Sequence, residues 1–141
     1  MRKYNSIHLV KGEDLNHHGT LFAARTAAWF VESAFAAAAA EHKNSSEILC
    51  RNIHGMSFAI PVEKGDVITF TSRVARAGRT SLTVHVSVRS ELTGIEQVKG
   101  FITFVVVDND TGRAKPHGIV LDEPDEEERK IRELANKLFE K

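Results

Sequence analysis

The segment from Thr20 to Glu41 is the feature that most constrains the fold. It contains ten alanines and neither glycine nor proline, so its composition and length predict a single helix about 33 Å long. The larger apolar groups share a narrow stripe with two alanines: Leu21, Ala24, Ala28, Val31 and Phe35. Most of the remaining positions are also alanine or apolar, and a helix of this kind is usually buried. We therefore expect a long buried helix, small enough in cross-section for a sheet to approach it closely.

After this helix the hydrophobic period changes from 3.6 to 2, which is typical of strands. The pattern predicts strands over residues 48–58, 67–76, 81–90 and 97–108, and a short strand near residue 7. An AGRT turn joins the strands over residues 67–76 and 81–90, as in a β-hairpin. The sequence thus predicts an α+β fold in which a curved antiparallel sheet wraps one long helix. Such a sheet needs a partner for its edge or its other face, so we expect a dimer.

The last 21 residues differ in composition from the rest. Residues 121–141 hold eight acids and five bases, and an amphipathic pattern starts at Pro124, which we place in the first turn of a helix. The apolar face of that helix is formed by Ile131, Leu134, Ala135 and Leu138. We predict a core domain over residues 1–120 and an acidic surface helix over residues 121–141.

Charge and length exclude several classes of partner. Nineteen basic residues balance nineteen acidic ones, so the overall attraction expected of a general nucleic-acid binder is missing. No apolar run approaches the ~20 residues of a membrane span, and the N-terminus lacks a signal-peptide core. We therefore expect a cytoplasmic protein. A single cysteine and no paired ligand motif argue against a metal site.

The stretch that leads into the long helix is the first candidate site. Gly19 and Thr20 would place free backbone N–H groups at the positive end of the helix, where an oxyanion or a carbonyl oxygen can bind. The alternative is that Asn16 or Thr20 simply caps the helix.

Two charged residues interrupt the apolar helix. Arg25 and Glu32 are seven residues apart and nearly superimposed in projection. A carboxylate beside apolar surface would be desolvated and suited to general-base work. The alternative is an ion pair between the two on a solvent-facing edge.

Four segments in order resemble the acyl-CoA thioesterases of the hotdog fold. They are NHHGTLF, HGMSFAIPVEKGDVITF, AGRTSLTVHVSV and GFITFVVVDNDTGRAKPHG, and the similarity covers roughly residues 5–118. The resemblance implies hydrolysis of an acyl-CoA thioester to a free acid and CoA, without a metal or organic cofactor. It also implies a homodimer, or a higher oligomer of dimers, with sites shared between subunits.

The resemblance also implies roles for individual residues. The thioester carbonyl would face the amides of Gly19 and Thr20, Asn16 would position water or the thioester, and a helix acid would act as base or nucleophile. Such enzymes place that acid at the position of Val31, one residue before Glu32. A one-residue step turns a side chain by about 100°.

The hairpin region supplies candidates for binding the CoA phosphates. Three arginines lie within the acid-free segment RVARAGRTS, and arginine suits phosphate contacts. The predicted phosphate contacts are Arg76, Arg79, Thr80 and Ser81, with Arg25 as a further candidate. Two other functions stay open: a hotdog acyl-CoA-binding protein without catalysis, and a hotdog dehydratase or hydratase.

Overall fold

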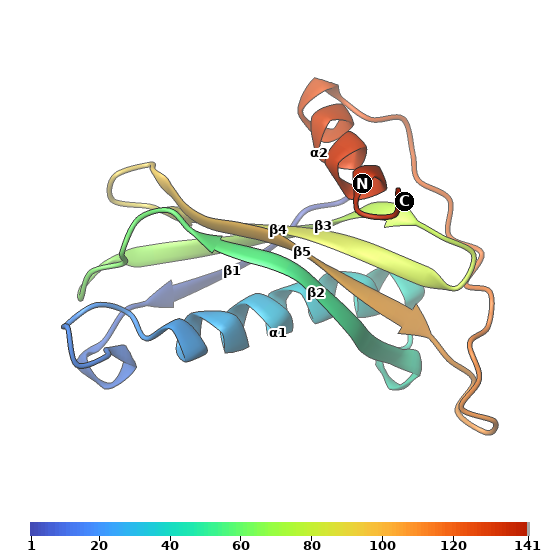
Figure 1. Cartoon of the computed structure of the whole chain (residues 1–141), viewed down its shortest axis with the longest axis horizontal. Coiled ribbons are helices and arrows are strands. Elements are labelled where there is room, and N and C mark those ends of the chain that lie inside the picture. The colour runs from blue at the N-terminus through green and yellow to red at the C-terminus, as the bar shows by residue number, and fades with distance from the viewer. Residues whose placement is uncertain (141) are drawn as a thin grey trace.

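The computed structural model describes residues 1–140 and shows one five-stranded antiparallel sheet with a helix on each face (Figure 1). The strands are β1 (Tyr4–Leu9), β2 (Ile48–Phe58), β3 (Val67–Ala77), β4 (Ser81–Ser90) and β5 (Glu96–Val106), and the helices are α1 (Ala23–His42) and α2 (Glu126–Lys137). In space the strand order is β1-β3-β4-β5-β2, so β1 and β2 form the two edges. The predicted α+β class and element order are confirmed.

The core lies between α1 and one face of the sheet. Phe30 and Ala34 of α1 are fully buried, as are Phe70, Val84 and Ile102 on the facing strands. In β4 the side chains alternate as predicted, with its valines toward α1 and its polar residues on the opposite face. This burial of apolar surface is the main force that holds α1 in the curve of the sheet.

The outer half of α1 is exposed, which corrects the predicted burial on nearly all sides. Ala24 and Ala28, two members of the predicted stripe, lie in solvent, because the sheet covers only one side of the helix. On one flank, Trp29 stacks on His8 of β1 with ring centroids 4.1 Å apart. On the other flank, Phe35 packs edge-on against Phe104 of β5. A single chain therefore leaves a band of small apolar side chains uncovered.

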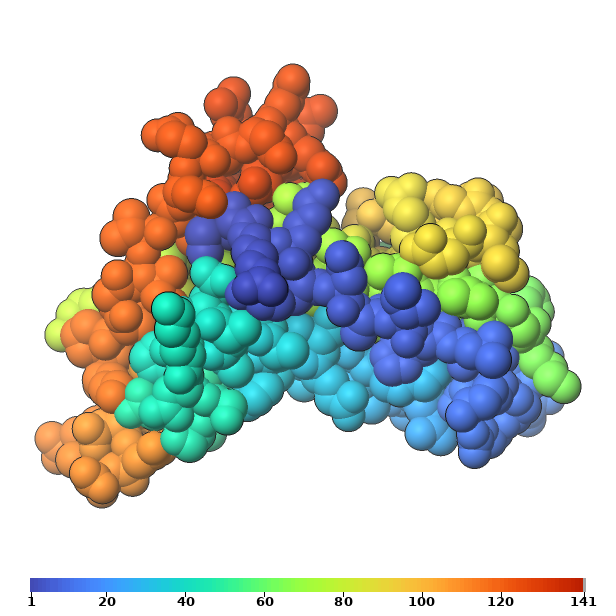
Figure 2. Space-filling model, turned by 180° about the vertical axis from the view of Figure 1, so that it is seen from behind, coloured from blue at the N-terminus to red at the C-terminus, as the bar shows by residue number. Residues whose placement is uncertain are grey.

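The predicted C-terminal surface helix is present and lies on the sheet face opposite α1 (Figure 1). Viewed from behind, α2 forms a ridge that stands out from the body of the molecule (Figure 2). Asp125 caps the helix by accepting a hydrogen bond from the Glu128 amide, so Pro124 precedes the cap instead of lying in the first turn. Arg73 of β3 is 4% exposed and pairs with Glu127 at 3.0 Å, which anchors α2 to the sheet.

Candidate functional site

The turn before α1 is held together by Asn16. Its side-chain oxygen accepts hydrogen bonds from the amides of His18 (2.8 Å) and Thr20 (3.2 Å), and its Nδ2 donates to the Thr20 hydroxyl. The amide of Gly19 donates to the Asn16 carbonyl at 3.1 Å, and Gly19 has a φ of 82°, a value that favours glycine. The predicted alternative, a capping role for Asn16, is thus close to the observed one, but Asn16 closes a turn and not the helix.

The helix begins three residues later than predicted, and this moves its free amides. The amide of Leu21 donates to the Val62 carbonyl, and that of Phe22 to the Asp14 carbonyl, so the chain stays extended up to Phe22. Within residues 1–140, the amides of Ala23 and Ala24 have no hydrogen-bond partner, and both residues are exposed.

The structure therefore does not leave the amides of Gly19 and Thr20 free, as the prediction assumed, and the free amides are those of Ala23 and Ala24. The amides of Gly19 and Thr20 are occupied within the turn, whereas the first two amides of α1 face solvent at its positive end. Sequence reasoning missed the two alanines because it started the helix at the first residue after Gly19. Asn16 was the available signal for a later helix start. Asparagine often closes a turn by accepting a hydrogen bond from the amide two residues later, here that of His18.

Glu32 does not occupy a desolvated position, and it does not pair with Arg25. Its side chain is exposed and has no ion pair among the described residues. Arg25 lies beside Asp14, with 3.4 Å between its Nε and the buried carboxylate. The predicted ion pair between Arg25 and Glu32 is therefore wrong, because the loop before α1 supplies a closer acid than the helix does. The predicted role of Glu32 as a base stays a prediction.

The two flanks of α1 separate Glu32 from Val31. Glu32 lies three residues after Trp29 and hence on the flank that faces β1. Val31 lies four residues before Phe35 and hence on the flank that faces β5 and the edge strand β2. The position that the resemblance assigns to an acid thus holds valine and faces the β2 edge.

The β2 edge is apolar and open. Among the strands that the structure describes, β2 pairs with β5 alone, and three of its large apolar side chains are about half exposed: Leu49 at 51%, Ile53 at 48% and Phe58 at 49%. Unpaired strand edges with apolar side chains are unusual in isolated chains, because they invite pairing with another strand.

The predicted phosphate-binding residues lie at the other end of the sheet. The β3–β4 turn is at the opposite end from the start of α1 (Figure 1), so Arg25 and the hairpin arginines are not brought together in one chain. Arg79 is exposed, and the Arg76 guanidinium lies 3.9 Å from the ring centroid of Phe139. Neither arginine has an ion pair within residues 1–140. The backbone carbonyls of Thr80 and Ser81 accept hydrogen bonds from Val106 and His117.

Metal-binding clusters and membrane spans are both missing from the described residues. In residues 1–140, no group of three or more His, Cys, Asp and Glu side chains is arranged to hold a metal ion. Neither helix in that range has the length and apolarity needed to cross a membrane.

Comparison with known proteins places this geometry in a family. An acyl-CoA hydrolase from Staphylococcus aureus, solved in complex with butyryl coenzyme A, coenzyme A and coenzyme A disulfide, superposes with a TM-score of 0.86 at 25% identity, over 96% of this chain and 80% of that one. A hexameric acyl-CoA thioesterase superposes with a TM-score of 0.87 at 29% identity, over 96% and 87%. Both similarities agree with the predicted hotdog fold.

A curated relative from Zymomonas mobilis, described as an uncharacterized acyl-CoA thioester hydrolase, is 37% identical over 59 residues. That match spans 39% of this chain and 40% of the relative. Residues 18–95, more than half of the chain, match the thioesterase superfamily, and this range contains α1 and its free N-terminus. The chain therefore belongs to the thioesterase superfamily.

Proposed function

We propose that this protein hydrolyses acyl-CoA thioesters to a free carboxylic acid and CoA. The observation that carries the proposal is the uncapped N-terminus of α1, where the amides of Ala23 and Ala24 are free and the side chains are small. A thioester carbonyl oxygen can approach these amides closely, and the charge that develops on it during attack by water is stabilised there. The names of the relatives agree with this activity. A cytoplasmic location stays a prediction from the sequence.

The proposed active unit is a two-fold dimer formed along β2. Pairing two β2 strands would satisfy the open edge and cover the half-exposed side chains of Leu49, Ile53 and Phe58. The exposed alanines of α1 lie beside the same edge, so they would be covered in the same step. We also propose that such dimers assemble into a higher oligomer, as in the hexameric relative.

The proposed carboxylate is Glu32, with Asn16 as a positioning residue. Glu32 is the only acid on α1 before its last turn. It is about 13 Å along the helix axis from Ala23, at 1.5 Å per residue, which is too far for one thioester to touch both within a single chain. The proposal therefore uses the Glu32 of the other subunit and requires its side chain to reach the thioester from the flank that faces β1. Asn16 contributes through the turn that it closes in front of the free amides.

Phosphate binding is assigned to Arg76 and Arg79, assisted by Thr80 and Ser81. Neither arginine is neutralised by an acid within the described chain. Because the hairpin lies at the far end of the sheet from α1's start, it would reach a CoA bound at the other subunit of an antiparallel dimer. Arg25 is assigned a structural role with Asp14.

A turnover assay tests the activity. Free thiol released from a panel of acyl-CoAs is measured for the wild type, for Glu32→Gln and for Glu41→Gln, an acid of the last helical turn that bonds Tyr4. We expect Glu32→Gln to lose about 2 to 4 orders of magnitude in turnover, and Glu41→Gln to retain it. No thiol release above background from any acyl-CoA would refute the proposed function.

Subunit exchange tests the shared site. If Asn16 of one subunit serves Glu32 of the other, a mixed dimer of Asn16→Ala and Glu32→Gln chains holds one doubly damaged site and one intact site. Random exchange should then restore about a quarter of wild-type activity, because half of the dimers are mixed and half of their sites are intact. Failure to recover activity after exchange has been demonstrated would mean that the two residues do not act across subunits.

One observation favours a second candidate, an acyl-CoA-binding protein without turnover. Valine occupies the flank of α1 that faces the β2 edge, and Glu32 faces the β1 side. The same panel separates the two functions: saturable acyl-CoA binding without thiol release supports the binding protein.

A further inference from the structure

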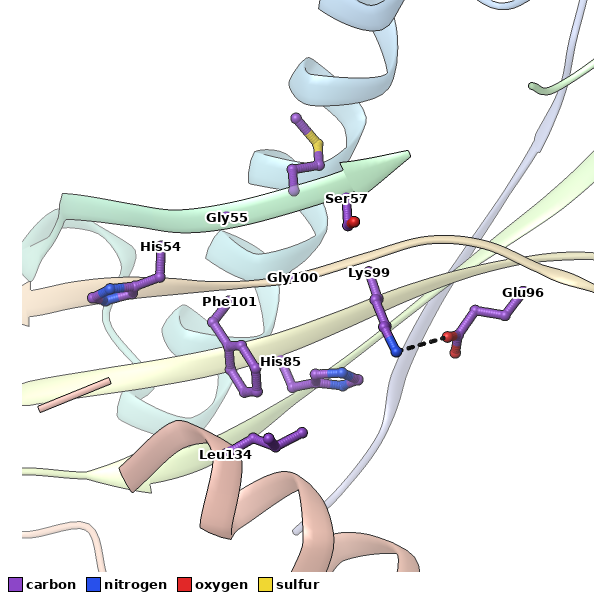
Figure 3. Close-up of a pocket in the computed structure, with 10 residues that line it drawn as sticks. His54, Gly55, Ser57, His85, Glu96, Lys99, Gly100, Phe101 and Leu134 are labelled. Carbon is purple, nitrogen blue, oxygen red and sulfur yellow. Dashed lines mark ion pairs between the residues drawn. The ribbon is translucent and has the colours of Figure 1, made fainter. Parts of the chain in front are cut away.

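A cavity lies on the sheet face opposite α1, away from the proposed thioester site. It has a volume of about 510 Å³, within the range of about 300–1000 Å³ that small-molecule sites occupy. Its floor is formed by His85 of β4 with Lys99 and Phe101 of β5, and its sides by Ser57 of β2 and Leu134 of α2 (Figure 3). We call it the outer-face cavity. Residues from four elements that are distant in sequence thus meet around one space.

His85 is an unpartnered polar group at the centre of this cavity. In residues 1–140, its ring nitrogens have no hydrogen-bond partner, whereas His54 at the rim is bonded to the Thr103 hydroxyl. The ring lies edge-on to Phe101, with centroids 5.0 Å apart. Burial, with smaller contributions from Arg73 and Lys99, lowers the pKa of His85 to about 4. The ring is therefore neutral at pH 7 and offers one N–H donor that no described residue uses.

The charges around the cavity favour an anion of low charge. Lys99 is largely exposed and held only by a long contact of 3.9 Å to Glu96. Arg73, close by, is committed to Glu127 of α2 at 3.0 Å. One loosely held cation beside one carboxylate suits a monoanion, because a group of higher charge would meet the negative field of Glu96.

The remaining walls are apolar. Leu134 of α2 faces the sheet, where Phe101 and His85 lie side by side (Figure 3). Leu134 is 51% exposed, so an apolar ligand laid against it would remove further apolar surface from water. The site therefore combines a cation, a neutral N–H donor and two apolar walls.

We propose that the outer-face cavity binds a small monocarboxylic acid with an aliphatic body. The carboxylate is held between the Lys99 ammonium and the His85 ring N–H, and the aliphatic body lies between Phe101 and Leu134. A charge-assisted contact to Lys99 fixes the head group, and burial of the chain supplies the rest of the affinity. This inference does not depend on the proposed thioesterase activity.

Octanoate is the probe for this site, with 1-octanol as its uncharged counterpart. Binding is followed by calorimetry and by NMR signals of the His85 ring and the Leu134 methyl groups, which locate the ligand on the outer face. We expect octanoate to shift both sets of signals. Removal of the cation in Lys99→Gln should weaken octanoate about tenfold or more, and Leu134→Trp, which fills the cavity from α2, should abolish the shifts of the His85 ring.

Lys64→Gln is the matched control, because Lys64 is an exposed lysine in the loop before β3. It should bind octanoate like the wild type. The proposal is overturned if octanoate shifts neither His85 nor Leu134, if Lys99→Gln and Lys64→Gln bind equally, or if 1-octanol binds as tightly as octanoate. A change of assembly size in Leu134→Trp would assign this face to a second copy of the chain and would also overturn it.

Discussion

Gly100 of β5 is the position where one methyl group should do most damage to the fold. It faces α1, directly opposite Met56 of β2. A Cβ atom at Gly100 would lie 1.8 Å from the carbonyl oxygen of Gly55 and 3.0 Å from the Phe30 ring. Backbone cannot rotate away as a side chain can, so β2 would have to retreat by more than about 1 Å to restore an ordinary contact.

This displacement sets the expected magnitude for Gly100→Ala. A retreat of that size breaks the β2–β5 hydrogen bonds on either side of Met56, at about 1 kcal/mol each. Crowding against Phe30 adds about 1–3 kcal/mol. The total of roughly 3–5 kcal/mol corresponds to a fall in Tm of about 10–20 °C for a chain of this size.

Thermal unfolding followed by circular dichroism measures the effect, with urea unfolding as an independent check. Gly12→Ala is the matched control, because a Cβ at Gly12 meets only the Lys64 side chain at 4.0 Å, and its Tm should stay within about 4 °C of the wild type. A Gly100→Ala transition as high as that of Gly12→Ala would refute the close approach of β2 and β5.

Three further predictions concern α2, the hairpin and the outer face. Truncation after Val120 should lower the Tm, since α2 is anchored through Arg73, but should leave turnover per folded site largely intact; a folded truncation without activity would contradict this. Arg76→Ala and Arg79→Ala should each raise the Michaelis constant for acyl-CoA about tenfold through loss of a phosphate contact, and unchanged constants in both would remove these residues from the site. Because burial lowers the pKa of His85 to about 4, its stabilising effect is present above about pH 6.5 and is lost as the pH falls towards 4. Between about pH 6.5 and 4 the His85 effect should therefore lower the unfolding free energy of the wild type by about 3 kcal/mol. His85→Phe should not show this part of the decrease.

The strand bounds could be read from the sequence because turn residues mark them. β4 occupies the predicted residues 81–90 and β2 the predicted residues 48–58, since the AGRT turn and Pro61 limit where pairing can extend. These signals are local, and local chemistry is what a single sequence expresses best.

The candidate site was less predictable because it depends on contacts between distant segments. The start of α1 is set by hydrogen bonds from Leu21 and Phe22 to Val62 and Asp14, and no periodicity reveals such bonds. The flank that Glu32 occupies is fixed by the stacking of Trp29 on His8. The outer-face cavity needs α2 to lie on a particular face, which depends on the ion pair between the buried Arg73 and Glu127 of α2.

The strand order has a consequence for how the chain folds. β3, β4 and β5 are consecutive in sequence and in space, so they can form as a meander of short-range pairs. β2 is made before all three but pairs only with β5, and its first residue, Ile48, is opposite Val106. Pairings of such long sequence separation are slow to form. An emerging chain therefore carries β2 without a neighbour until β5 has been synthesised, and the edge that two subunits would share is the last part of the sheet to become available.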